Sequence, residues 1–381
     1  MKKLGYLGPP GTFSHTAAMQ YAAGKDFLPV CCSGLEIVFR QIQTGRMDAG
    51  MVPAENSTGG TVAETLDLLS AVEGVYITGE LLLPVHQHLL VRPGVTLREI
   101  KKVYSHPQAL SQCRHTLQDK LPGVPVTETA STAVAAFMVS ASDRPPAAAV
   151  GSISAAENYG LEMLCSDIQD NGDSNVTRFL VLGREKATPT GPARTSLVLA
   201  VKDRPGALYH ILREFALRKI NLTRIESRPA GNKLGDYIFF IDFLGREDEP
   251  AVRTAIADIG EFVLWQRLLG SYPVYRGADG LETDEISPAD GTVNLAGIRE
   301  KIDLVDSEIM RLLTIRQHLV DEVARFKAGQ NQIVDRQREE EVVNRVRELA
   351  AENNLDPVIT EQIYRLIIRG SVLRQRQLIS F

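Results

Sequence analysis

Apolar residues recur at alternating spacings of three and four between residues 295 and 326, near the end of the chain. The positions of this stripe are Leu295, Ile298, Ile302, Val305, Ile309, Leu312, Leu319, Val323 and Phe326. The spacing predicts a single amphipathic helix of roughly 33 residues, about 50 Å long. One position breaks the pattern, because Arg316 stands in the stripe between Leu312 and Leu319. A buried cation is costly unless an anion compensates it, so we expect either an internal salt bridge or a bound anionic ligand.

Two further cations on this helix bear on that choice. Lys327 follows Arg316 by three helical turns and projects from the same face about 16 Å along the axis. Two such side chains could hold the opposite ends of a small dianion. Arg299 lies about 25 Å before Arg316 and is rotated off that face. We expect Arg299 to be either a surface charge or a contribution to the site of a partner chain.

The rest of the pattern divides the chain into three predicted domains. Residues 1–186 alternate short β-like runs with helical patterns, which is typical of an α/β fold. Residues 194–275 predict a small α+β domain in the order βαββαβ, and residues 292–381 contain helical patterns alone. The expected elements of the middle domain are strands at Ser196–Val201, Leu222–Ser227, Asp236–Phe243 and Phe262–Leu268, and helices that start near Gly206 and Pro250. Turn-rich segments at 186–192 and 277–291 separate the three domains.

Composition narrows the possible classes of protein. The chain has 381 residues, of which 44% are hydrophobic and 23% charged, and its net charge is −5. These values are typical of a soluble globular protein and give no electrostatic footprint for nucleic acid. Because no apolar stretch reaches about 18 residues, we expect no membrane span. The four cysteines are scattered without metal spacing, which favours a reducing cytoplasm; they are Cys31, Cys32, Cys113 and Cys165.

Polar residues of the last two helices complete a pattern with Arg316 and Lys327. They are Asp335, Arg338 and Glu339 at the start of the second helix, and Ser371 and Gln375 on the third. Together these residues resemble the all-α chorismate mutase family over nearly all of residues 294–380. The resemblance implies three helices that intertwine with those of a second chain. It also implies that the protein promotes the rearrangement of chorismate to prephenate only by holding the reactive conformer and by stabilising the developing negative charge. A pericyclic step needs no nucleophile or base.

The mutase resemblance implies one role for each polar position. These roles are carboxylate binding for Arg316, Arg338 and Arg299 of the partner subunit, donation to the ether oxygen for Lys327 and Gln375, binding of the ring hydroxyl for Glu339, and lining of the pocket for Asp335 and Ser371.

Residues 1–186 contain several polar clusters. They are Gly8–Ser14, Pro53–Ser57, Ser105–Leu110, Ser131–Ala133 and Asn175–Phe179. The first could be a capped strand-to-helix turn, and it lacks the Lys-Ser/Thr ending of a phosphate loop. The histidines have no convincing metal spacing. In combination the clusters resemble the prephenate dehydratase family over about residues 4–183, with Thr177-Arg178-Phe179 as the most specific part.

The dehydratase resemblance implies two α/β lobes similar to the periplasmic-binding fold, with the site in the cleft between them. It implies that Thr177 is catalytic and that Asn56, Ser105, Gln112 and Arg178 bind or orient the substrate. Aromatisation drives the loss of carbon dioxide and of the ring hydroxyl, so we expect no cofactor. A threonine hydroxyl is a weak acid, so we expect Thr177 to act as a positioned donor.

The middle domain resembles an ACT domain. The residues that carry this resemblance are Gly206, Ala207 and Leu208 at the first helix start, and Glu226, Ser227, Arg228 and Pro229 at the end of the second strand. Free N–H groups at a helix start attract a carboxylate. A helix cap without a ligand would show the same sequence pattern. The resemblance implies that L-phenylalanine binds here at a dimer interface and inhibits the dehydratase.

Three alternatives remain at this level. The chain could be an amino-acid sensor without catalysis, but a sensor has no use for Arg316, Lys327 and Gln375 together. The dehydratase could prefer arogenate to prephenate. One catalytic domain could also have decayed, although both sets of motifs are intact. We expect a homodimer or homotetramer, and the order of domains, with the mutase last, gives no support for direct transfer of prephenate between the sites.

Overall fold

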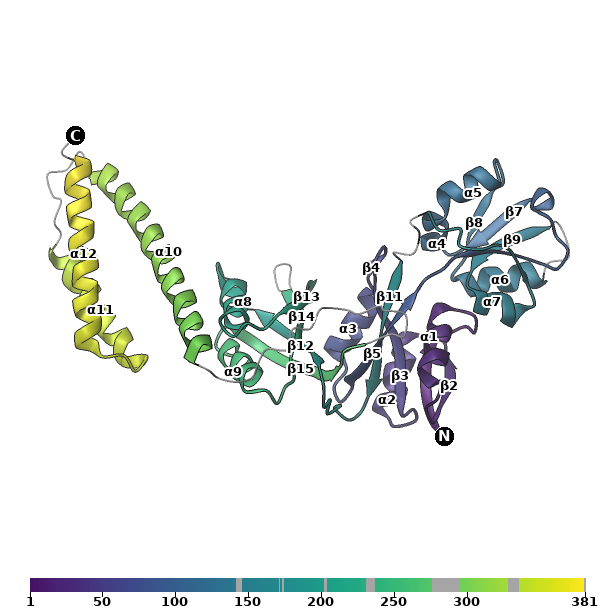
Figure 1. Cartoon of the computed structure of the whole chain (residues 1–381), viewed down its shortest axis with the longest axis horizontal. Coiled ribbons are helices and arrows are strands. Elements are labelled where there is room, and N and C mark those ends of the chain that lie inside the picture. Colours follow the sequence, from purple (N-terminus) through teal and green to yellow (C-terminus); the bar gives the residue numbers. More distant parts are fainter. Residues whose placement is uncertain are drawn as a thin grey trace. The chain divides into compact units, whose positions relative to one another are not determined.

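The computed structural model describes residues 1–141, 146–170, 172, 175–201, 204–230, 237–275, 295–327 and 336–379. The chain forms two compact units, Met1–Ala289 and Asp290–Phe381, each described here by itself (Figure 1). The segment 277–291, expected to separate domains, lies outside the described residues. No helix among the described residues is long and apolar enough to cross a membrane.

The first lobe of unit one, lobe A, is built on a mixed sheet in the order β2-β1-β3-β11-β5, with β4 paired to β3. Its strands are β1 (Lys2–Leu7), β2 (Phe27–Cys32), β3 (Ala49–Asn56), β4 (Gly60–Thr61), β5 (Tyr76–Pro84) and β11 (Val176–Gly183). Its helices are α1 (Phe13–Ala22), α2 (Leu35–Gln43) and α3 (Ala63–Ala71). Strands β1, β2 and β3 are parallel, whereas β11 runs antiparallel to β3 and β5. The start of β11 therefore lies beside the end of β3.

The second lobe, lobe B, has a sheet in the order β10-β6-β9-β7-β8. Its strands are β6 (His88–Val91), β7 (Lys102–Ser105), β8 (Val126–Glu128), β9 (Ala147–Gly151) and β10 (Glu162–Cys165). Its helices are η1 (Leu97–Glu99), α4 (Pro107–Gln112), α5 (Arg114–Lys120), α6 (Thr132–Ala141) and α7 (Ile153–Tyr159). Alanine-rich β9 is entirely buried, because α6 and α7 cover one face with small side chains and residues of α4 and α5 pack on the other.

Two chain segments connect the lobes, one from β5 to β6 and one from β10 to β11. They are hydrogen-bonded to each other: Val85 N–H donates to the Asn175 carbonyl at 2.7 Å, and Ile168 N–H donates to the Gln87 carbonyl at 2.8 Å. Paired crossings of this kind define a two-lobed binding fold and form its natural hinge. The expectation of two α/β lobes with a periplasmic-binding-like arrangement is confirmed.

The third sheet of unit one is antiparallel, in the order β13-β14-β12-β15. Its elements are β12 (Ala193–Val201), α8 (Ala207–Leu217), β13 (Leu222–Pro229), β14 (Tyr237–Leu244), α9 (Pro250–Ile259) and β15 (Val263–Pro273). One face packs against α8 and α9, and the other shares a core with lobe A, which includes Leu69, Leu180, Phe240 and Tyr272. The predicted βαββαβ order is confirmed, and this ACT-like sheet belongs to the same compact unit as the two lobes.

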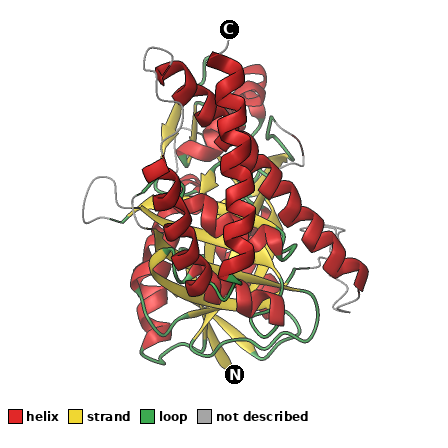
Figure 2. Ribbon diagram, turned by 90° about the vertical axis from the view of Figure 1, so that its left-hand side faces the viewer, coloured by secondary structure: helices red, strands yellow, loops and turns green. Residues whose placement is uncertain are grey.

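Unit two consists, in its described residues, of the helices α10 (Leu295–Lys327), α11 (Arg336–Glu352) and α12 (Pro357–Ile379) with their connections, drawn as long red helices in Figure 2. The first helix has the predicted 33 residues. Helices α11 and α12 pack along each other, while the first half of α10 diverges from them (Figure 1). The expected all-helical fold is confirmed.

Candidate functional site

Six neutral polar side chains meet where lobe A, lobe B and the second crossing come together. We call them the cross-lobe amide cluster: Asn56, Thr58, Gln108, Gln112, Asn175 and Thr177. Asn56 ends β3, and Thr177 begins β11 directly opposite it in the sheet register. The cluster thus lies at the carboxyl end of the parallel strands of lobe A, the edge where ligands bind in open α/β sheets.

The side chain of Asn56 is fixed by backbone donors. Its Oδ1 accepts hydrogen bonds from the N–H groups of Thr58 (3.2 Å) and Gly59 (2.7 Å). The amide nitrogen must therefore point the other way, and it donates to Thr177 Oγ1 at 2.9 Å and to Asn175 Oδ1 at 2.8 Å. Since its oxygen already accepts this bond, Thr177 has its hydroxyl hydrogen left to donate. Among the described residues no acceptor takes that hydrogen.

Lobe B reaches this cluster through α4. Gln108 Nε2 donates to Asn56 Oδ1 at 3.1 Å, and Gln112 Nε2 donates to Thr58 Oγ1 at 2.7 Å. A side chain at Gly59 would place its Cβ 2.0 Å from Gln108 Nε2 and would displace the Gln108 amide from this position. The two glutamines thus join lobe B to the residues beside Thr177, which is only 9% exposed. A substrate that reaches Thr177 must replace these hydrogen bonds.

Asp170 fixes α5 of lobe B, which directly follows α4, to the second crossing. Its carboxylate accepts hydrogen bonds from the N–H groups of His115 and Thr116, both at 2.9 Å, at the start of α5. Partial burial raises the pKa of Asp170, but these hydrogen bonds outweigh burial and hold the pKa below its usual value. The aspartate N–H also donates to the Gln112 carbonyl at 2.7 Å. The end of α4 is therefore held at a defined distance from the hinge.

Ser105 and Arg178 lie apart from the other expected dehydratase residues. The Ser105 hydroxyl is fully buried and donates to the Val150 carbonyl at 2.7 Å, within the lobe B sheet. Arg178 follows Thr177 on β11, and its side chain is buried with Glu80 and Asp242 on the side of the ACT-like sheet. The structure therefore brings together Thr177, Asn56 and Gln112, and it gives the other two side chains partners outside the cluster.

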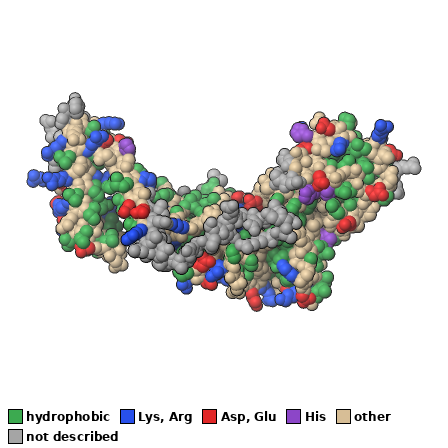
Figure 3. Space-filling view, viewed as in Figure 1, with side chains coloured by type: hydrophobic (Ala, Val, Ile, Leu, Met, Phe, Trp, Pro, Cys, Tyr) green, Lys and Arg blue, Asp and Glu red, His purple; other side chains and the backbone are tan. Residues whose placement is uncertain are grey.

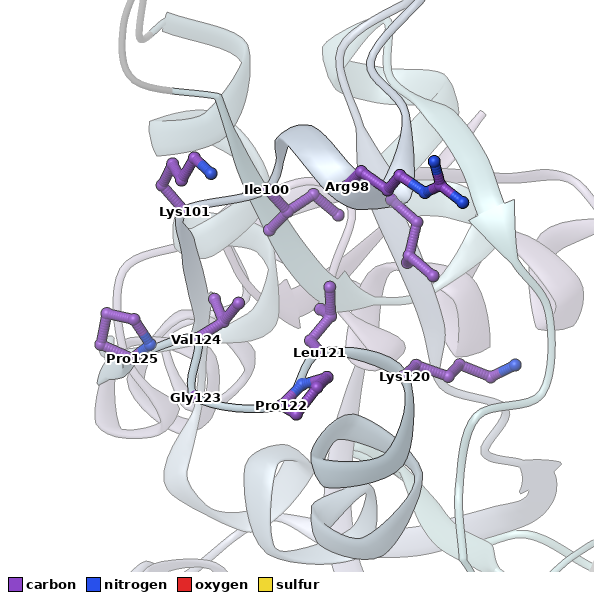
Figure 4. A pocket seen from close by; sticks show the side chains of 10 residues that line it. Arg98, Ile100, Lys101, Lys120, Leu121, Pro122, Gly123, Val124 and Pro125 are labelled. Carbon is purple, nitrogen blue, oxygen red and sulfur yellow. The ribbon is translucent and has the colours of Figure 1, made fainter.

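Two cavities of unit one are lined by residues outside the cluster. One, of about 510 Å³, is bounded by the segments before β7 and before β8, including Ile100, Leu121 and Val124 (Figure 4). It lies at the opposite end of β7 from Ser105 and α4, so it does not adjoin the cluster. The other, of about 590 Å³, lies beside Cys31 at the ends of β1 and β2. Among the described residues, no three His, Cys, Asp or Glu side chains gather as metal ligands would.

The cation in the apolar stripe of unit two contacts the third helix. Arg316 on α10 donates through Nη1 to the Ser371 hydroxyl on α12. Ser371 and Gln375 are one turn apart and buried, at 8% and 9% exposure. No carboxylate of the described residues forms an ion pair with Arg316; the nearby Asp321 instead pairs with Arg374 at 3.2 Å. The structure thus brings Arg316, Ser371 and Gln375 together without a neutralising anion among the described residues.

The remaining mutase positions are less closely grouped in one chain. Arg299 is exposed near the start of α10, Arg338 is exposed on α11 with Glu341 at 3.0 Å, and Glu339 is half-buried. Lys327 ends α10, but its side chain is not among those described, and Asp335 lies outside the described residues. The single chain thus assembles part of the expected site.

Apolar side chains on α10 and α12 are uncovered in this single chain. On α10 the exposed positions include Ile302, Val305, Ile309, Leu312, Leu319, Val323 and Phe326. Figure 3 shows apolar side chains distributed along these helices. This stripe contains most of the positions that predicted the amphipathic helix. Because a contiguous apolar surface of this size is unusual on a monomer, the stripe marks an unfilled packing surface of unit two.

The expected effector residues occupy two places on the ACT-like sheet. Gly206 precedes α8 with a φ of +83°, the left-handed region that favours glycine, and Ala207 and Leu208 begin the helix. On β13, Glu226 accepts a hydrogen bond from the Thr61 hydroxyl at 3.0 Å. Arg228 pairs with Asp67 at 2.8 Å. Both partners belong to lobe A, so this strand contacts the lobe directly.

Successive side chains of β13 point to opposite faces of the strand, and this alternation determines which of them contact lobe A. Arg224, Glu226 and Arg228 face lobe A, and Arg224 approaches Glu55 at 3.5 Å. Ser227 and Pro229 are exposed, as alternate positions of a strand require. Glu226 and Arg228 therefore have partners already, while Ser227 and Pro229 remain open to solvent.

The sequence did not single out Gln108, Thr58, Glu80 and Asp242 as members of these groups. A signal existed for Gln108, because it precedes Gln112 by one helical turn and so shares its face. No local signal existed for Glu80 or Asp242, which meet Arg178 only through sheet packing.

Comparison with known proteins assigns each part of the chain. Family models match for prephenate dehydratase at residues 4–187, for the ACT domain at 195–261 and for chorismate mutase type II at 298–376. A bifunctional chorismate mutase/prephenate dehydratase of Aquifex aeolicus is 43% identical over 272 residues, which are 71% of this chain and 73% of that protein. An arogenate dehydratase/prephenate dehydratase of Arabidopsis thaliana is 37% identical, over 71% of this chain and 72% of that protein.

Among solved structures, the prephenate dehydratase of Arthrobacter aurescens in complex with L-Phe is similar, with a TM-score of 0.67 and 35% identity. The match covers 81% of this chain and 99% of that one. The prediction of an enzyme with dehydratase and mutase domains around an ACT domain is confirmed. The chain belongs to the family of bifunctional chorismate mutase/prephenate dehydratases, here with the dehydratase domain first and the mutase domain last.

Proposed function

We propose that the chain catalyses two consecutive reactions under feedback control. The helical unit rearranges chorismate to prephenate. The two-lobed part converts prephenate and one proton to phenylpyruvate, carbon dioxide and water. L-Phenylalanine binds the ACT-like sheet and inhibits the second reaction. The observation that carries the dehydratase half is the Asn56–Thr177 hydrogen bond, which leaves a hydroxyl hydrogen aimed away from Asn56 in a closed cleft.

The neutral character of the cross-lobe amide cluster supports this chemistry. As prephenate loses carbon dioxide, the negative charge of its ring carboxylate moves into the ring and toward the departing hydroxyl. A cation at the carboxylate would stabilise the starting state more than the transition state, whereas amides orient it without neutralising it. Thr177 is the proposed donor to the leaving oxygen, with Asn56 and Gln112 as the residues that orient the substrate. Ser105 lies within the lobe B sheet and supports the part of lobe B that borders the proposed site.

A second argument favours prephenate over arogenate. Arogenate has an ammonium group where prephenate has a ketone, and a buried ammonium needs an anion. All six members of the cluster are neutral, and two carboxylates of neighbouring residues already have partners: Glu55 lies 3.5 Å from Arg224, and Asp170 accepts from the N–H groups of His115 and Thr116. We therefore propose prephenate as the preferred substrate. The ratio of kcat/KM for the two compounds tests this, and a ratio in favour of arogenate would contradict it.

For the mutase half, the supporting observation is that no carboxylate of the described residues pairs with Arg316. It is held by the Ser371 hydroxyl beside Gln375, which suits a carboxylate ligand next to a neutral donor. We propose that Arg316, Arg338 and Arg299 of the partner subunit bind the chorismate carboxylates. Lys327 and Gln375 stabilise the charge on the breaking ether bond, Glu339 binds the ring hydroxyl, and Asp335 and Ser371 line the pocket.

A homodimer follows from the same proposal. The uncovered apolar stripe of α10 needs a partner, and Arg299 lies too far along the helix to share a pocket with Arg316 of its own chain. A second copy of the chain supplies both a covering surface and the missing cation. If the ACT-like sheets pair through a separate surface, a homotetramer results. A reducing cytoplasm is the proposed location, since all four cysteines are free.

The effector site is proposed at the start of α8 and the end of β13. The N–H groups at the start of α8 after Gly206 suit the phenylalanine carboxylate; among them, the Ala207 N–H donates to the Arg204 carbonyl at 3.2 Å in this structure, and an effector would replace that bond. Glu226, Ser227, Arg228 and Pro229 form the second wall. Glu226 and Arg228 also bond to Thr61 and Asp67 of lobe A. An effector that binds these two side chains therefore changes the contact between β13 and lobe A.

One experiment tests the proposed function as a whole. Purified full-length protein receives chorismate, and prephenate and phenylpyruvate are followed with and without L-phenylalanine. We expect both products in sequence, and less phenylpyruvate when phenylalanine is present. Formation of neither product would refute the proposal. Absence of any response up to millimolar phenylalanine would refute the regulatory part alone.

A further inference from the structure

The buried side chain of Arg178 joins strands of two different sheets. Its Nε lies 2.8 Å from Glu80 Oε2 on β5, its Nη1 lies 2.6 Å from Asp242 Oδ2 on β14, and its Nη2 lies 2.9 Å from the Tyr272 hydroxyl on β15. All four side chains are buried. Every nitrogen of the guanidinium therefore has a partner, and two of the three partners belong to the ACT-like sheet.

Arg178 directly follows Thr177 on β11. Successive side chains of a strand point to opposite faces, so Thr177 faces the cross-lobe amide cluster while Arg178 faces the ACT-like sheet. Their Cα atoms are about 3.8 Å apart. A displacement of the Arg178 backbone is therefore passed to the Thr177 hydroxyl and to its hydrogen bond with Asn56.

The partners of Arg178 are themselves held in place. Asp242 accepts a hydrogen bond from the Ser196 hydroxyl at 2.6 Å, and Ser196 lies 2.7 Å from the Tyr272 hydroxyl. Arg194 Nη1 lies 2.7 Å from Glu80 Oε2, so two buried cations are balanced by two buried carboxylates. Removing one member of a buried network leaves an uncompensated charge. A shift of the ACT-like sheet must therefore move Arg178 along with it.

We propose that Arg178 is a positioning residue for the catalytic threonine, through which Asp242 and Tyr272 of the ACT-like sheet set the position of Thr177. A rearrangement of that sheet then alters the turnover of bound substrate more than its binding. This role differs from the substrate contact expected from the sequence, because the guanidinium is buried and each of its nitrogens already bonds to Glu80, Asp242 or Tyr272. The inference rests on the proposed dehydratase function of the two lobes.

The test uses Asp242→Asn in the full-length protein. Asparagine keeps the size of the side chain and an acceptor for Ser196, but it removes the charge that holds Arg178. We expect kcat for prephenate dehydration to fall about tenfold, with KM changed less than twofold, and the inhibition by phenylalanine to weaken. Chorismate mutase activity stays at the wild-type level. If the Asp242 side chain only supported the fold, its replacement would lower the unfolding temperature without a selective decrease of kcat at nearly constant KM.

Two further variants make the result decisive. Tyr272→Phe removes only the hydroxyl that Arg178 contacts, so it tests the same link if Asp242→Asn fails to fold. Ser271→Ala is the matched control, because Ser271 is equally buried on β15 but bonds to Thr195 and Glu247 instead of Arg178. We expect kcat of Ser271→Ala to stay within twofold of the wild type.

The outcomes separate this inference from the function on which it rests. If the wild type does not turn over prephenate, both fail. If the wild type is active and the folded Asp242→Asn and Tyr272→Phe proteins keep both its kcat and its response to phenylalanine, the positioning role alone is overturned. A large increase in KM at unchanged kcat would also overturn it, since that result indicates substrate binding.

Discussion

Asn56 Nδ2 lies 2.9 Å from Thr177 Oγ1, and the two residues are directly opposite each other on β3 and β11. Because Thr177 Oγ1 accepts this bond, its hydroxyl hydrogen remains for another acceptor, which supports the proposed role of Thr177 as a donor to the substrate. Thr177→Val keeps the shape of the side chain and removes the hydroxyl. We expect kcat for prephenate dehydration to fall by roughly 10²–10⁴, the usual contribution of proton donation. Steady-state assays with added prephenate measure this.

Thr177→Ser serves as the control for that change. Serine keeps the hydroxyl and the bond from Asn56, so its kcat should lie much nearer to that of the wild type. Conversion of chorismate to prephenate should be unaffected by either substitution. Equal losses in the Ser and Val variants would rule out the hydroxyl as the active group.

Closure of the cleft by α4 gives a second prediction. Gln108→Ala removes the bond from lobe B to Asn56 and should raise KM for prephenate and lower kcat several-fold, because Asn56 loses one of the bonds that fix it. Ser111→Ala, at an exposed position of the same helix outside the cluster, should behave as the wild type. Steady-state kinetics of the two variants test this prediction. Identical KM values would show that Gln108 does not contribute to the site.

Because no described carboxylate pairs with Arg316, its replacement should cause a selective loss of mutase activity. Arg316→Ala should lower kcat/KM for chorismate by at least about 10², comparable to the removal of one preorganised charge donor. Arg325→Ala changes an exposed cation of the same helix and should have little effect. Prephenate dehydration should continue in both variants. Undiminished rearrangement in Arg316→Ala would contradict the proposed anion site.

The uncovered stripe of α10 predicts that the mutase depends on association. Ile309→Asp places a charge in the proposed dimer contact, so sedimentation should show a loss of the helical pairing and chorismate turnover should fall with it. Thr314→Asp adds the same charge on the opposite face of the helix and should leave both unchanged. Full mutase activity in a form of Ile309→Asp that does not pair through this helix would refute the shared site.

Asp170 predicts a dependence of stability on pH. Its pKa is held below the usual value in the folded protein by the N–H groups of His115 and Thr116, although burial opposes this. A carboxyl whose folded pKa is depressed contributes stability above its unfolded pKa, near 4, and this contribution is lost as the pH falls through the folded pKa.

Asp170→Asn should therefore cost roughly 1 kcal/mol at pH 7 and should lose less stability than the wild type as the pH falls from 6 to 3. Urea denaturation over this range measures both effects. Asp119→Asn, at an exposed position of α5, is the control. An unchanged slope with pH in Asp170→Asn would show that these bonds do not matter in solution.

Periodicity explains which parts of the fold were predictable from the sequence. The 3.6-residue repeat of α10 and the alternating strands of the ACT-like sheet are local signals, and both elements lie where they were expected. The division into two lobes followed from the family resemblance. Asn56 and Thr177 were expected near each other because each lies in a quoted polar cluster, and Gln112 was expected from the family resemblance; the structure brings the three together, while their roles stay predictions.

The surroundings of Arg178 were not predictable in the same way. Its partners Glu80 and Asp242 are 98 and 64 residues away along the chain, and neither belongs to a motif. Only the pairing of β11 with β5 and the packing of the ACT-like sheet bring them together. A motif therefore identified the position of Arg178, whereas its contacts depended on tertiary structure.

The position of β11 in the sheet of lobe A has a consequence for biosynthesis. Strands β3 and β5 leave the ribosome early, but the strand that belongs between them is synthesised only after all of lobe B. Until then the nascent chain exposes two strand edges that can pair with other chains. Rapid, independent folding of lobe B, or protection by a chaperone during translation, should therefore determine the yield of active enzyme.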